Sequence, residues 1–451
     1  MKNQMKGKKG ITLIALVITV IVLLILAGVT IATLTGDNGL LQKTQKAKDD
    51  STDAELKEEI QLAWNKVYAD YYLDNSETKA ERLEKELSNN AKVTEVGNKL
   101  NISNYKNINK TFILDIENGS LDVKQLSAVE QAIINETVFY EKNTPLTDEY
   151  GNTFIVPKGF KLASDSAEVV TEGIVIEDAT YTNTIGSQFV WIPVSKDNKK
   201  IVGPAYSGVD RMEKKELLIS LGRYTFKNDG TIDIIKSDGG KISITYPWNE
   251  TYEFKEEKNR ATGNSNAVAK NIENFKTKTI DAEGFWIGRY EARTTSNISR
   301  TSENDTLTSV TENKNNAIYN YIKQSDACTL SQNMYKKEND GITDITKFES
   351  DLINSYAWDT TILFLQEFGK KNYSRYNGKL QNSIDGTKDI YCNICNISSY
   401  YCWTTESCNR SNNPCVYRSC YTDADYSSGR WYAKTSSAPI GCVFRPVLYV
   451  N

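Results

Sequence analysis

The sequence predicts an α+β protein that consists of an apolar N-terminal helix, a small α+β head and a larger, loop-rich domain. Residues 11–34 contain no charged residue and no proline, and residues 51–74 place apolar side chains at helical spacing. From Phe154 onward, short aromatic strands alternate with stretches of Gly, Asn, Ser and Thr. A length of 451 residues with 39% apolar and 25% charged residues allows two or three globular domains.

The composition excludes several function classes. A net charge of −4 and a pI near 5.4 provide no basic field, so no nucleic-acid partner is expected. The chain contains no histidine, which removes Ser-His-Asp and Cys-His catalysis and every histidine-based metal site. The one CxxC, Cys392–Cys395, has no second CxxC to complete a zinc site. The eight cysteines therefore indicate disulfides or surface thiols, and no metal or cofactor is expected.

The N-terminus predicts a membrane segment. As a helix, residues 11–34 would span about 36 Å, which is enough to cross a bilayer. Lys2, Lys6, Lys8 and Lys9 precede the apolar run and are expected to stay in the cytoplasm. The sequence therefore predicts a single-pass protein of the cell membrane whose C-terminal domain is extracellular.

The junction "KKGITLIALVITVIVLLILAGV" resembles the processing site of type IV pilins and of pilin-like subunits of type II secretion systems. The resemblance implies a leader at 1–10, a prepilin peptidase that cuts after Gly10 and methylates Ile11, and a retained stem helix at 11–50. It also implies other pilin subunits as partners. That family usually carries a glutamate five residues into the mature chain, where this sequence has Ala15, so assembly into a pilus stays open. The alternative is an uncut single-pass anchor.

A small α+β head is expected at residues 51–145. Its predicted elements are helices at 51–74 and 77–89 and strands within 92–100 and 110–126, the last forming a hairpin around 117–119. Ser51 or Asp53 is expected to cap the first helix. A turn-rich boundary at 141–152 then separates the head from a second domain at 150–451.

Four segments characterise the second domain. They are an apolar strand at 187–197, an alternating strand at 284–294, a helix at 354–369 with Asp359 in its first turn, and a closing strand at 441–451 with a buried Arg445. Two polar stretches, 263–279 and 294–316, are expected to be long surface loops.

Taken in order, these segments resemble the formylglycine-generating-enzyme or sulfatase-modifying-factor family, a variant of the C-type lectin fold. The corresponding residues are Phe189–Pro193, Gly284–Ala292, Tyr356–Thr360, Ser399–Trp403, Arg418–Cys420 and Val443–Val447. The resemblance implies a loop-rich C-type lectin-like domain over residues 150–451. The family has an Arg-Gly-Gly turn, to which Arg418–Cys420 correspond here. The oxidising members bind copper through two cysteines that lie a few residues apart after this turn. Here no cysteine lies between Cys420 and Cys442, so the protein is not expected to be an enzyme.

The composition of residues 390–432 predicts a binding face. Of these 43 residues, 25 are Tyr, Ser, Cys or Asn, none is Lys and one is Glu. Tyr supplies contact area at low entropic cost, and Ser and Asn supply adaptable hydrogen bonds, as in antibody loops. Within a variable ligand face at 390–443, the predicted contacts to a protein or glycan ligand are Tyr391, Asn393, Asn396, Tyr400, Tyr401, Asn409, Arg410, Tyr417, Tyr421, Asp423, Asp425, Tyr426, Arg430 and Tyr432.

This composition also resembles that of target proteins of diversity-generating retroelements in bacteria, in which template adenines are randomised. Randomised Asn codons yield Tyr, Ser, Cys and Asp but cannot yield Lys, Glu, Gln, Met or Trp. Trp403, Glu406 and Trp431 would then be fixed framework residues. The alternative is that the Tyr and Cys residues are themselves the framework of a disulfide-stapled fold.

The sequence thus predicts a non-enzymatic cell-surface display protein, a pilin-like adhesin or receptor that binds its ligand through C-terminal loops. Two alternatives remain open. One is an extracytoplasmic copper-dependent oxidase of the formylglycine-generating type, with Cys415 or Cys420 acting together with Cys442. The other is a structural minor pilin or pseudopilin without a ligand.

Overall fold

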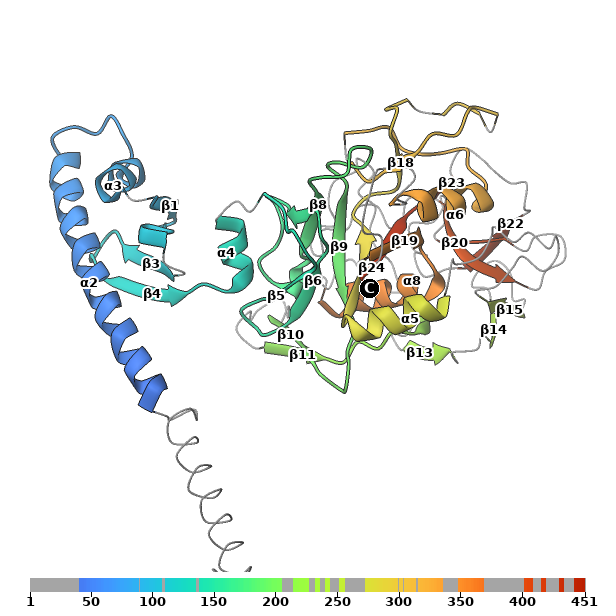
Figure 1. Cartoon of the computed structure of the whole chain (residues 1–451), viewed down its shortest axis with the longest axis horizontal. Coiled ribbons are helices and arrows are strands. Elements are labelled where there is room, and N and C mark those ends of the chain that lie inside the picture. The colour runs from blue at the N-terminus through green and yellow to red at the C-terminus, as the bar shows by residue number, and fades with distance from the viewer. Residues whose placement is uncertain are drawn as a thin grey trace, which may run out of the picture. The chain divides into compact units, whose positions relative to one another are not determined.

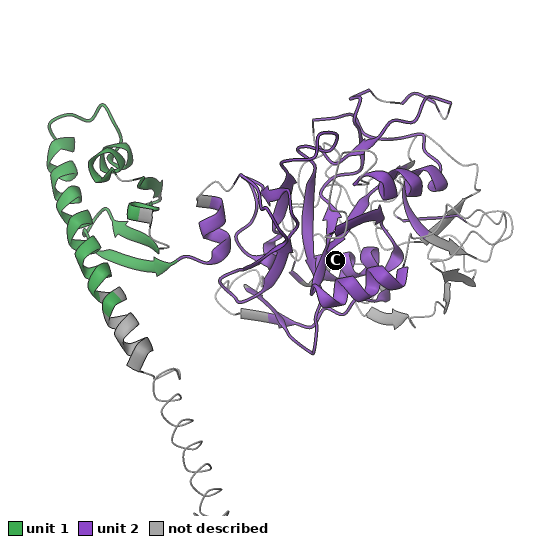
Figure 2. Cartoon of the chain, in the orientation of Figure 1, with its two compact units in different colours: residues 1–125 green, residues 126–451 purple. Residues whose placement is uncertain are grey.

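The computed structural model describes residues 40–368, 401–408, 415–418, 430–433 and 442–450. The gaps within these ranges are 89, 108–109, 135–137, 205–213, 227–231, 236–239, 244–250, 256–271, 299, 303, 314 and 336–347. The chain divides into two compact units, Met1–Gln125 (unit 1) and Leu126–Asn451 (unit 2), which are described separately (Figure 2). Both units combine helices with largely antiparallel sheets, so the predicted α+β class is confirmed.

The described part of unit 1 contains two α-helices, a short 3-10 helix and a four-stranded antiparallel meander. Its elements are α2 (Leu40–Tyr71), α3 (Lys79–Leu87), β1 (Lys92–Val96), β2 (Lys99–Ser103), the 3-10 helix η1 (Tyr105–Asn107), β3 (Lys110–Asp115) and β4 (Leu121–Gln125) (Figure 1). The strands pair in chain order. The predicted hairpin around 117–119 is confirmed, with Gly119 at φ +65°, a conformation that favours glycine.

The helices of unit 1 follow their sequence pattern with one correction. Leu56, Ile60 and Trp64 recur at helical spacing and are buried in one core with Phe112 of β3. The expectation that Ser51 or Asp53 caps the first helix is wrong, because α2 already includes Leu40 and both residues lie within it. Residues 40–50 are mostly good helix formers, so the helix does not need to begin at the first capping residue.

Unit 2 contains the remaining elements (Figure 1). Its helices are α4 (Ala128–Ile134), η2 (Val170–Glu172), α5 (Ile272–Asp281), α6 (Gln324–Asn333) and α8 (Ser355–Phe368). Its strands are β5 (Thr144–Thr147), β6 (Thr153–Val156), β7 (Phe160–Leu162), β8 (Val175–Asp178), β9 (Gln188–Pro193), β10 (Ile201–Pro204), β11 (Lys214–Leu217), β12 (Arg223–Phe226), β13 (Ile232–Ile235), β14 (Gly240–Ser243), β15 (Thr251–Lys255), β16 (Gly284–Gly288), β17 (Arg293–Thr294), β18 (Val310–Thr311), β19 (Phe348–Leu352), β20 (Tyr401–Cys408), β21 (Cys415–Arg418), β22 (Arg430–Ala433), β23 (Cys442–Phe444) and β24 (Pro446–Val450).

Two six-stranded sheets organise unit 2. The central sheet has the order β19-β24-β16-β9-β8-β7, and every residue of β9, β16 and β24 is buried. Trp191 of β9 pairs with Trp286 of β16, and their ring centroids lie 4.9 Å apart. Gly284 is required beside them, because a Cβ there would lie 2.6 Å from the Ile192 carbonyl oxygen. The C-terminal sheet has the order β14-β15-β20-β21-β22, with β23 also paired to β20.

The strand at 187–197, the strand at 284–294 and the helix at 354–369 are confirmed as β9, β16 and α8. The closing segment differs from its prediction. It forms two strands in different sheets, β23 and β24, and the buried Arg445 lies between them. The expected surface loop at 263–279 is also wrong in part, because α5 begins at Ile272 and buries Phe275.

The division between the units lies before the expected boundary at 141–152. Unit 2 already begins at Leu126, and Val129 of α4 is buried in its core. The turn-forming residues of that segment instead close the β5–β6 hairpin. Asp148 Oδ1 accepts hydrogen bonds there from the backbone N–H groups of Tyr150 and Asn152.

Candidate functional site

The C-terminal sheet carries those predicted ligand residues that the structure describes. Tyr401 lies in β20, Tyr417 in β21, and Arg430 and Tyr432 in β22. The other predicted contacts lie outside the described residues: Tyr391, Asn393, Asn396, Tyr400, Asn409, Arg410, Tyr421, Asp423, Asp425 and Tyr426. The structure therefore brings four of the fourteen positions into one sheet.

The strand register relates these positions to the framework. Trp403 pairs with Tyr417, and Tyr417 pairs in turn with Trp431. The Tyr417 ring is half-buried and meets the fully buried Trp403 ring edge to face, with the centroids 5.8 Å apart. Positions 430 and 432 pair with Arg418 and Val416, the neighbours of Tyr417 in the strand. Neighbouring positions of a strand face opposite sides of the sheet. Positions 430 and 432 therefore lie on the opposite face of the sheet from position 417.

Below this sheet, α8 supplies a buried carboxylate. The Asn354 side chain accepts a hydrogen bond from Ala357 N–H and so caps α8, which begins at Ser355. The expectation that Asp359 lies in the first turn is wrong, because Asp359 is the fifth residue of α8 and follows that turn. Arg418 Nη2 donates to Asp359 Oδ1, and both side chains are fully buried. Asp359 Oδ2 also accepts from Tyr224 N–H at 3.0 Å. Breaking such a buried pair costs about 3–5 kcal/mol, so it ties β21 to α8.

Strand β20 is attached by side-chain hydrogen bonds to backbone groups. Gln324 of α6 donates through Nε2 to the carbonyl oxygens of Thr404, at 2.6 Å, and Val416, at 3.4 Å. Trp403 Nε1 donates to the Ile322 carbonyl oxygen at 2.8 Å. These bonds fix β20 and β21 against α6. Sequence reasoning missed Gln324, because its partners lie 80 and 92 residues away and no local pattern indicates them.

A charged cluster lies where β16, β18 and β23 meet. Burial raises the pKa of Glu291 and raises that of Glu312 well above its usual range, while the positive charge of Arg445 opposes both shifts. Gly288 makes room for Glu312, because a Cβ there would lie 2.8 Å from the carboxyl carbon. Arg445 also donates to the Gly288 carbonyl oxygen, so the cluster joins the two six-stranded sheets.

Cys402 lies beside this cluster as a buried, free thiol. Burial raises its pKa to about 12, and Arg445 opposes the shift. A thiol with this pKa stays protonated at neutral pH, so Cys402 is a poor nucleophile and a poor metal ligand. Among the residues that the structure describes, no three His, Cys, Asp or Glu side chains are placed to hold a metal ion together.

The strand register bears on the copper alternative. Cys415 pairs with Ser407 on one side of β20, and Cys442 pairs with Tyr401 on the other side. The register of β20 against β21 shifts between Trp403 and Ser407, so the two levels are separated by two residues of β20, from Tyr401 to Trp403, and by two residues of β21, from Tyr417 to Cys415. At a rise of about 3.3 Å per residue this is about 13 Å along the strands. Cys415 and Cys442 are therefore too far apart to share a copper ion. Cys420 lies outside the described residues, so its pairing with Cys442 stays a prediction.

No protein-family model, curated protein or solved structure matches the chain. The predicted processing residues Gly10 and Ile11 and the predicted membrane segment 11–34 lie outside the described residues. Within the part that is described, no helix is long and apolar enough to span a membrane.

Proposed function

We propose that the protein is a non-enzymatic display protein of the cell surface. An N-terminal stem with pilin-like processing holds a C-type lectin-like domain outside the cell. The C-terminal sheet and the segments between its strands bind a protein or glycan ligand. The stem and its processing rest on the resemblance of residues 7–45 to pilins.

One observation carries the proposed binding face. Residues 409–414 and 419–429 connect β20, β21 and β22. Buried framework residues, chiefly Trp403, Arg418 and Gln324, hold β20 and β21 against the helices of unit 2. The two segments that connect these strands contain six of the fourteen predicted contact residues. A rigid framework that carries connecting segments rich in Tyr, Ser and Asn is the arrangement that binding loops use.

This arrangement also supports diversification by a retroelement. Trp403 is fully buried and cannot arise from a randomised Asn codon. Tyr417 is half-buried and can arise from one. At these two positions the fully buried residue is one that randomisation cannot supply, and the half-buried residue is one that it can supply.

The test is deep sequencing of the DNA that encodes residues 385–451 across many cells or strains, with a search of neighbouring DNA for a near-copy. We expect variation at adenine-matched codons, including the codon for Tyr417, while those for Trp403 and Arg445 stay constant. The codons for β24, which lie within the sequenced segment, serve as the internal control. An invariant segment without a template copy would contradict diversification and leave a fixed adhesin or a structural pilin.

A copper assay separates the display function from the oxidase. The oxidase requires copper binding and turnover of a cysteine-containing peptide, both lost in Cys420→Ser. We expect the full chain to bind no copper and to oxidise no such peptide. Stoichiometric copper binding that disappears in Cys420→Ser would overturn the display function.

A further inference from the structure

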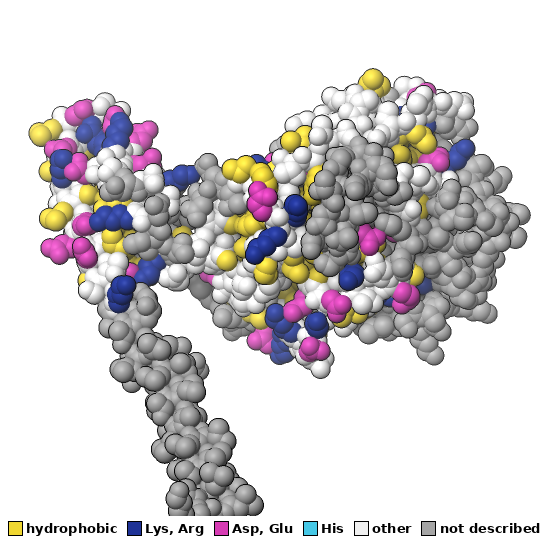
Figure 3. Space-filling view, viewed as in Figure 1, with side chains coloured by type: hydrophobic (Ala, Val, Ile, Leu, Met, Phe, Trp, Pro, Cys, Tyr) yellow, Lys and Arg dark blue, Asp and Glu magenta, His cyan; other side chains and the backbone are white. Residues whose placement is uncertain are grey.

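The charged cluster contains two buried carboxyl groups, those of Glu291 and Glu312. Figure 3 shows acidic and basic side chains at the surface of both units, where water solvates them. Glu291 and Glu312 are instead only 2% and 0% exposed. A buried carboxylate is unstable unless hydrogen bonds or an opposite charge replace the water that it loses. The partners of these two groups therefore decide whether they are ionised.

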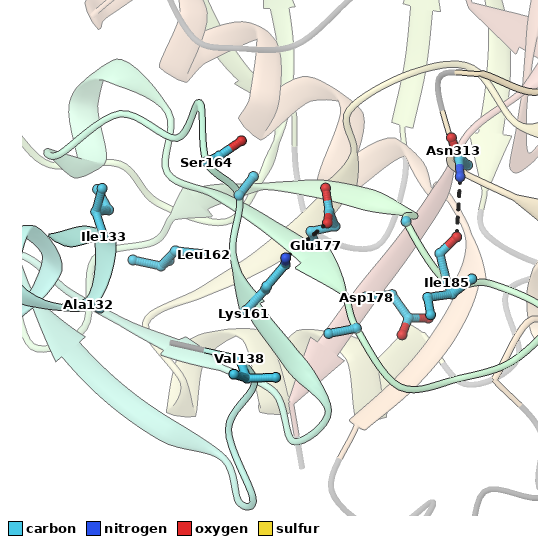
Figure 4. A pocket seen from close by; sticks show the side chains of 13 residues that line it. Ala132, Ile133, Val138, Lys161, Leu162, Ser164, Glu177, Asp178, Ile185 and Asn313 are labelled. Carbon is cyan, nitrogen blue, oxygen red and sulfur yellow. Dashed lines mark hydrogen bonds and ion pairs between the residues drawn. The ribbon is translucent and has the colours of Figure 1, made fainter. Parts of the chain in front are cut away.

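A groove beside β7 shows how unit 2 satisfies other carboxyl groups. It has a volume of about 780 Å³, lies between α4 and the edge of the central sheet, and is lined by Glu177, Asp178 and Asn313 among others (Figure 4). Glu177 Oε2 accepts from Gln188 Nε2 at 2.7 Å, and Glu177 Oε1 lies 3.5 Å from Lys161 Nζ. Asp178 accepts two hydrogen bonds at each of its oxygens. Every oxygen of these two carboxyl groups thus has a polar partner.

The two carboxyl groups of the charged cluster lack such partners. Glu312 Oε2 accepts a hydrogen bond from Tyr290 N–H, at the long distance of 3.3 Å. Among the residues that the structure describes, Glu312 Oε1 and Glu291 Oε2 have no hydrogen-bond partner. The Glu312 carboxyl group also packs against Gly288, where a Cβ would lie 2.8 Å from the carboxyl carbon. Two buried acceptor atoms are thus left without a donor.

The neighbouring cations do not supply the missing hydrogen bonds. The positive charges of Arg445 and Arg293 act on both carboxyl groups. Their guanidinium groups donate to backbone carbonyl oxygens, Arg445 Nη1 to that of Gly288 and Arg293 Nη1 to that of Asn316 at 2.9 Å. In the described part of the chain, neither arginine donates to the two carboxyl oxygens that lack a partner.

A proton supplies the donor that the cluster lacks. Burial raises the pKa of both carboxyl groups, and the negative charge of Glu291 raises that of Glu312 further. An un-ionised carboxyl group carries an O–H donor as well as an acceptor. One proton on Glu312 therefore removes the repulsion between the two groups and provides a donor for Glu291. Cys402, which faces the cluster from β20, keeps its own proton, because burial raises its pKa to about 12.

We propose that Glu312 is an un-ionised carboxylic acid at neutral pH and donates through Oε1 to Glu291 Oε2, which makes the cluster a pH-sensitive connection between the two sheets. The position of the pair supports this role, because Ala292 N–H, next to Glu291, donates to the Phe444 carbonyl oxygen of β23 at 2.8 Å. Since the pKa of Glu312 is raised in the folded state, its stabilising contribution is fully present below pH 4.5 and is lost as the pH rises through the raised pKa. Loss of the proton leaves two buried carboxylates that repel each other.

The test is infrared spectroscopy of the full chain at pH 8, in a detergent without carbonyl groups. An un-ionised carboxylic acid has a C=O stretching band that carboxylates lack. We expect this band in the unaltered chain, and labelling of glutamate with carbon-13 should shift it, which distinguishes it from a band of an aspartic acid. Glu312→Gln should remove the band. Glu130→Gln is the matched control and should keep it, because Glu130 is also buried but its carboxylate accepts from Ser127 N–H at 2.8 Å at the start of α4.

Urea-induced unfolding tests the connection itself. Glutamine keeps an uncharged donor at position 312, so Glu312→Gln should unfold at the same urea concentration as the unaltered chain at pH 7. At pH 10 it should unfold at a higher concentration, because it has no proton to lose there. Absence of the acid band at pH 8, a band that does not shift with the label, or a band that persists in Glu312→Gln would overturn the proposal. Equal losses of the urea midpoint between pH 7 and pH 10 in the two chains would overturn it as well. If Glu312→Gln does not fold, the labelled unaltered chain still decides.

Discussion

Arg418 and Asp359 form an ion pair in which both side chains are completely buried, although 59 residues separate them in the chain. The pair connects the strand that carries Tyr417 to α8. A buried ion pair is costly to break, because the remaining charge has no replacement solvent.

Replacement of Asp359 by Asn should therefore destabilise unit 2 by about 3 kcal/mol. The measurement is urea-induced unfolding followed by tryptophan fluorescence. Glu216→Gln is the control, because Glu216 pairs with Lys200 at 2.7 Å and both side chains of that pair are about half exposed. Its loss should cost less than about 1 kcal/mol. Equal losses in the two variants would show that burial does not set the strength of the Arg418–Asp359 pair.

Asp178 should make unit 2 less stable as the pH rises. Burial raises its pKa from 3.8 to about 6, although Thr184 and Tyr335 donate to the carboxylate. The folded state binds the proton more tightly than the unfolded state. This contribution is therefore fully present below pH 3.8 and is lost as the pH rises through 6.

The expected loss is about 3 kcal/mol between these limits. Asp178→Asn should remove it and flatten the free energy of unfolding over pH 4–7. Asp305→Asn provides a control of opposite sign. Backbone N–H groups of Thr301 and Ser302 lower the pKa of Asp305 to about 2, so its stabilisation is present above pH 3.8 and is lost toward pH 2. An unchanged profile in Asp178→Asn would contradict the assignment.

Thr78 should stabilise unit 1 through the capping box of α3. Its hydroxyl accepts from Glu81 N–H at 3.2 Å, and the Glu81 carboxylate accepts from Thr78 N–H at 2.9 Å. Thr78→Ala should lower the stability of unit 1 by about 1 kcal/mol. Thr52→Ala, in the interior of α2, should change it by less than about 0.5 kcal/mol, because alanine favours helix there. Helix content at 222 nm during thermal unfolding measures both.

Cys402 should not react with iodoacetamide in the folded protein. The thiol is buried, and burial raises its pKa to about 12. Peptide mapping by mass spectrometry should find Cys402 alkylated only after treatment with guanidinium. Rapid alkylation of Cys402 in the folded chain would show an accessible thiolate. It would contradict the conclusion that Cys402 is a poor nucleophile and a poor metal ligand.

The sequence predicted those elements whose signals are local. Continuous apolar runs identified β9 and β16, and the Asn-Gly turn identified the β3–β4 hairpin. It failed where distant contacts decide the outcome. Arg445 separates two strands, because β23 and β24 pair with strands of different sheets. The local sequence indicates neither of these pairings.

The candidate site follows the same division. Composition indicated residues 390–432, and Asp359 stood out in the first turn of a predicted helix. The hydrogen bonds of Gln324 depend on packing across 80 residues or more, so no pattern in the sequence indicates them. The groove beside β7 was missed for a similar reason. Its lining combines α4, the β7–β8 hairpin and Asn313, which are remote in sequence.

The position of β24 has a consequence for the order of folding. This strand lies between β19 and β16 inside the central sheet, and the adjoining β23 pairs with β20 of the other sheet. The central sheet of unit 2 cannot be completed until residues 446–450 have left the ribosome. Unit 1, whose strands pair in chain order, can fold while synthesis continues. Until β24 arrives, the edges of β16 and β19 that receive it have no partner, so unit 2 is exposed to aggregation during synthesis for longer than unit 1.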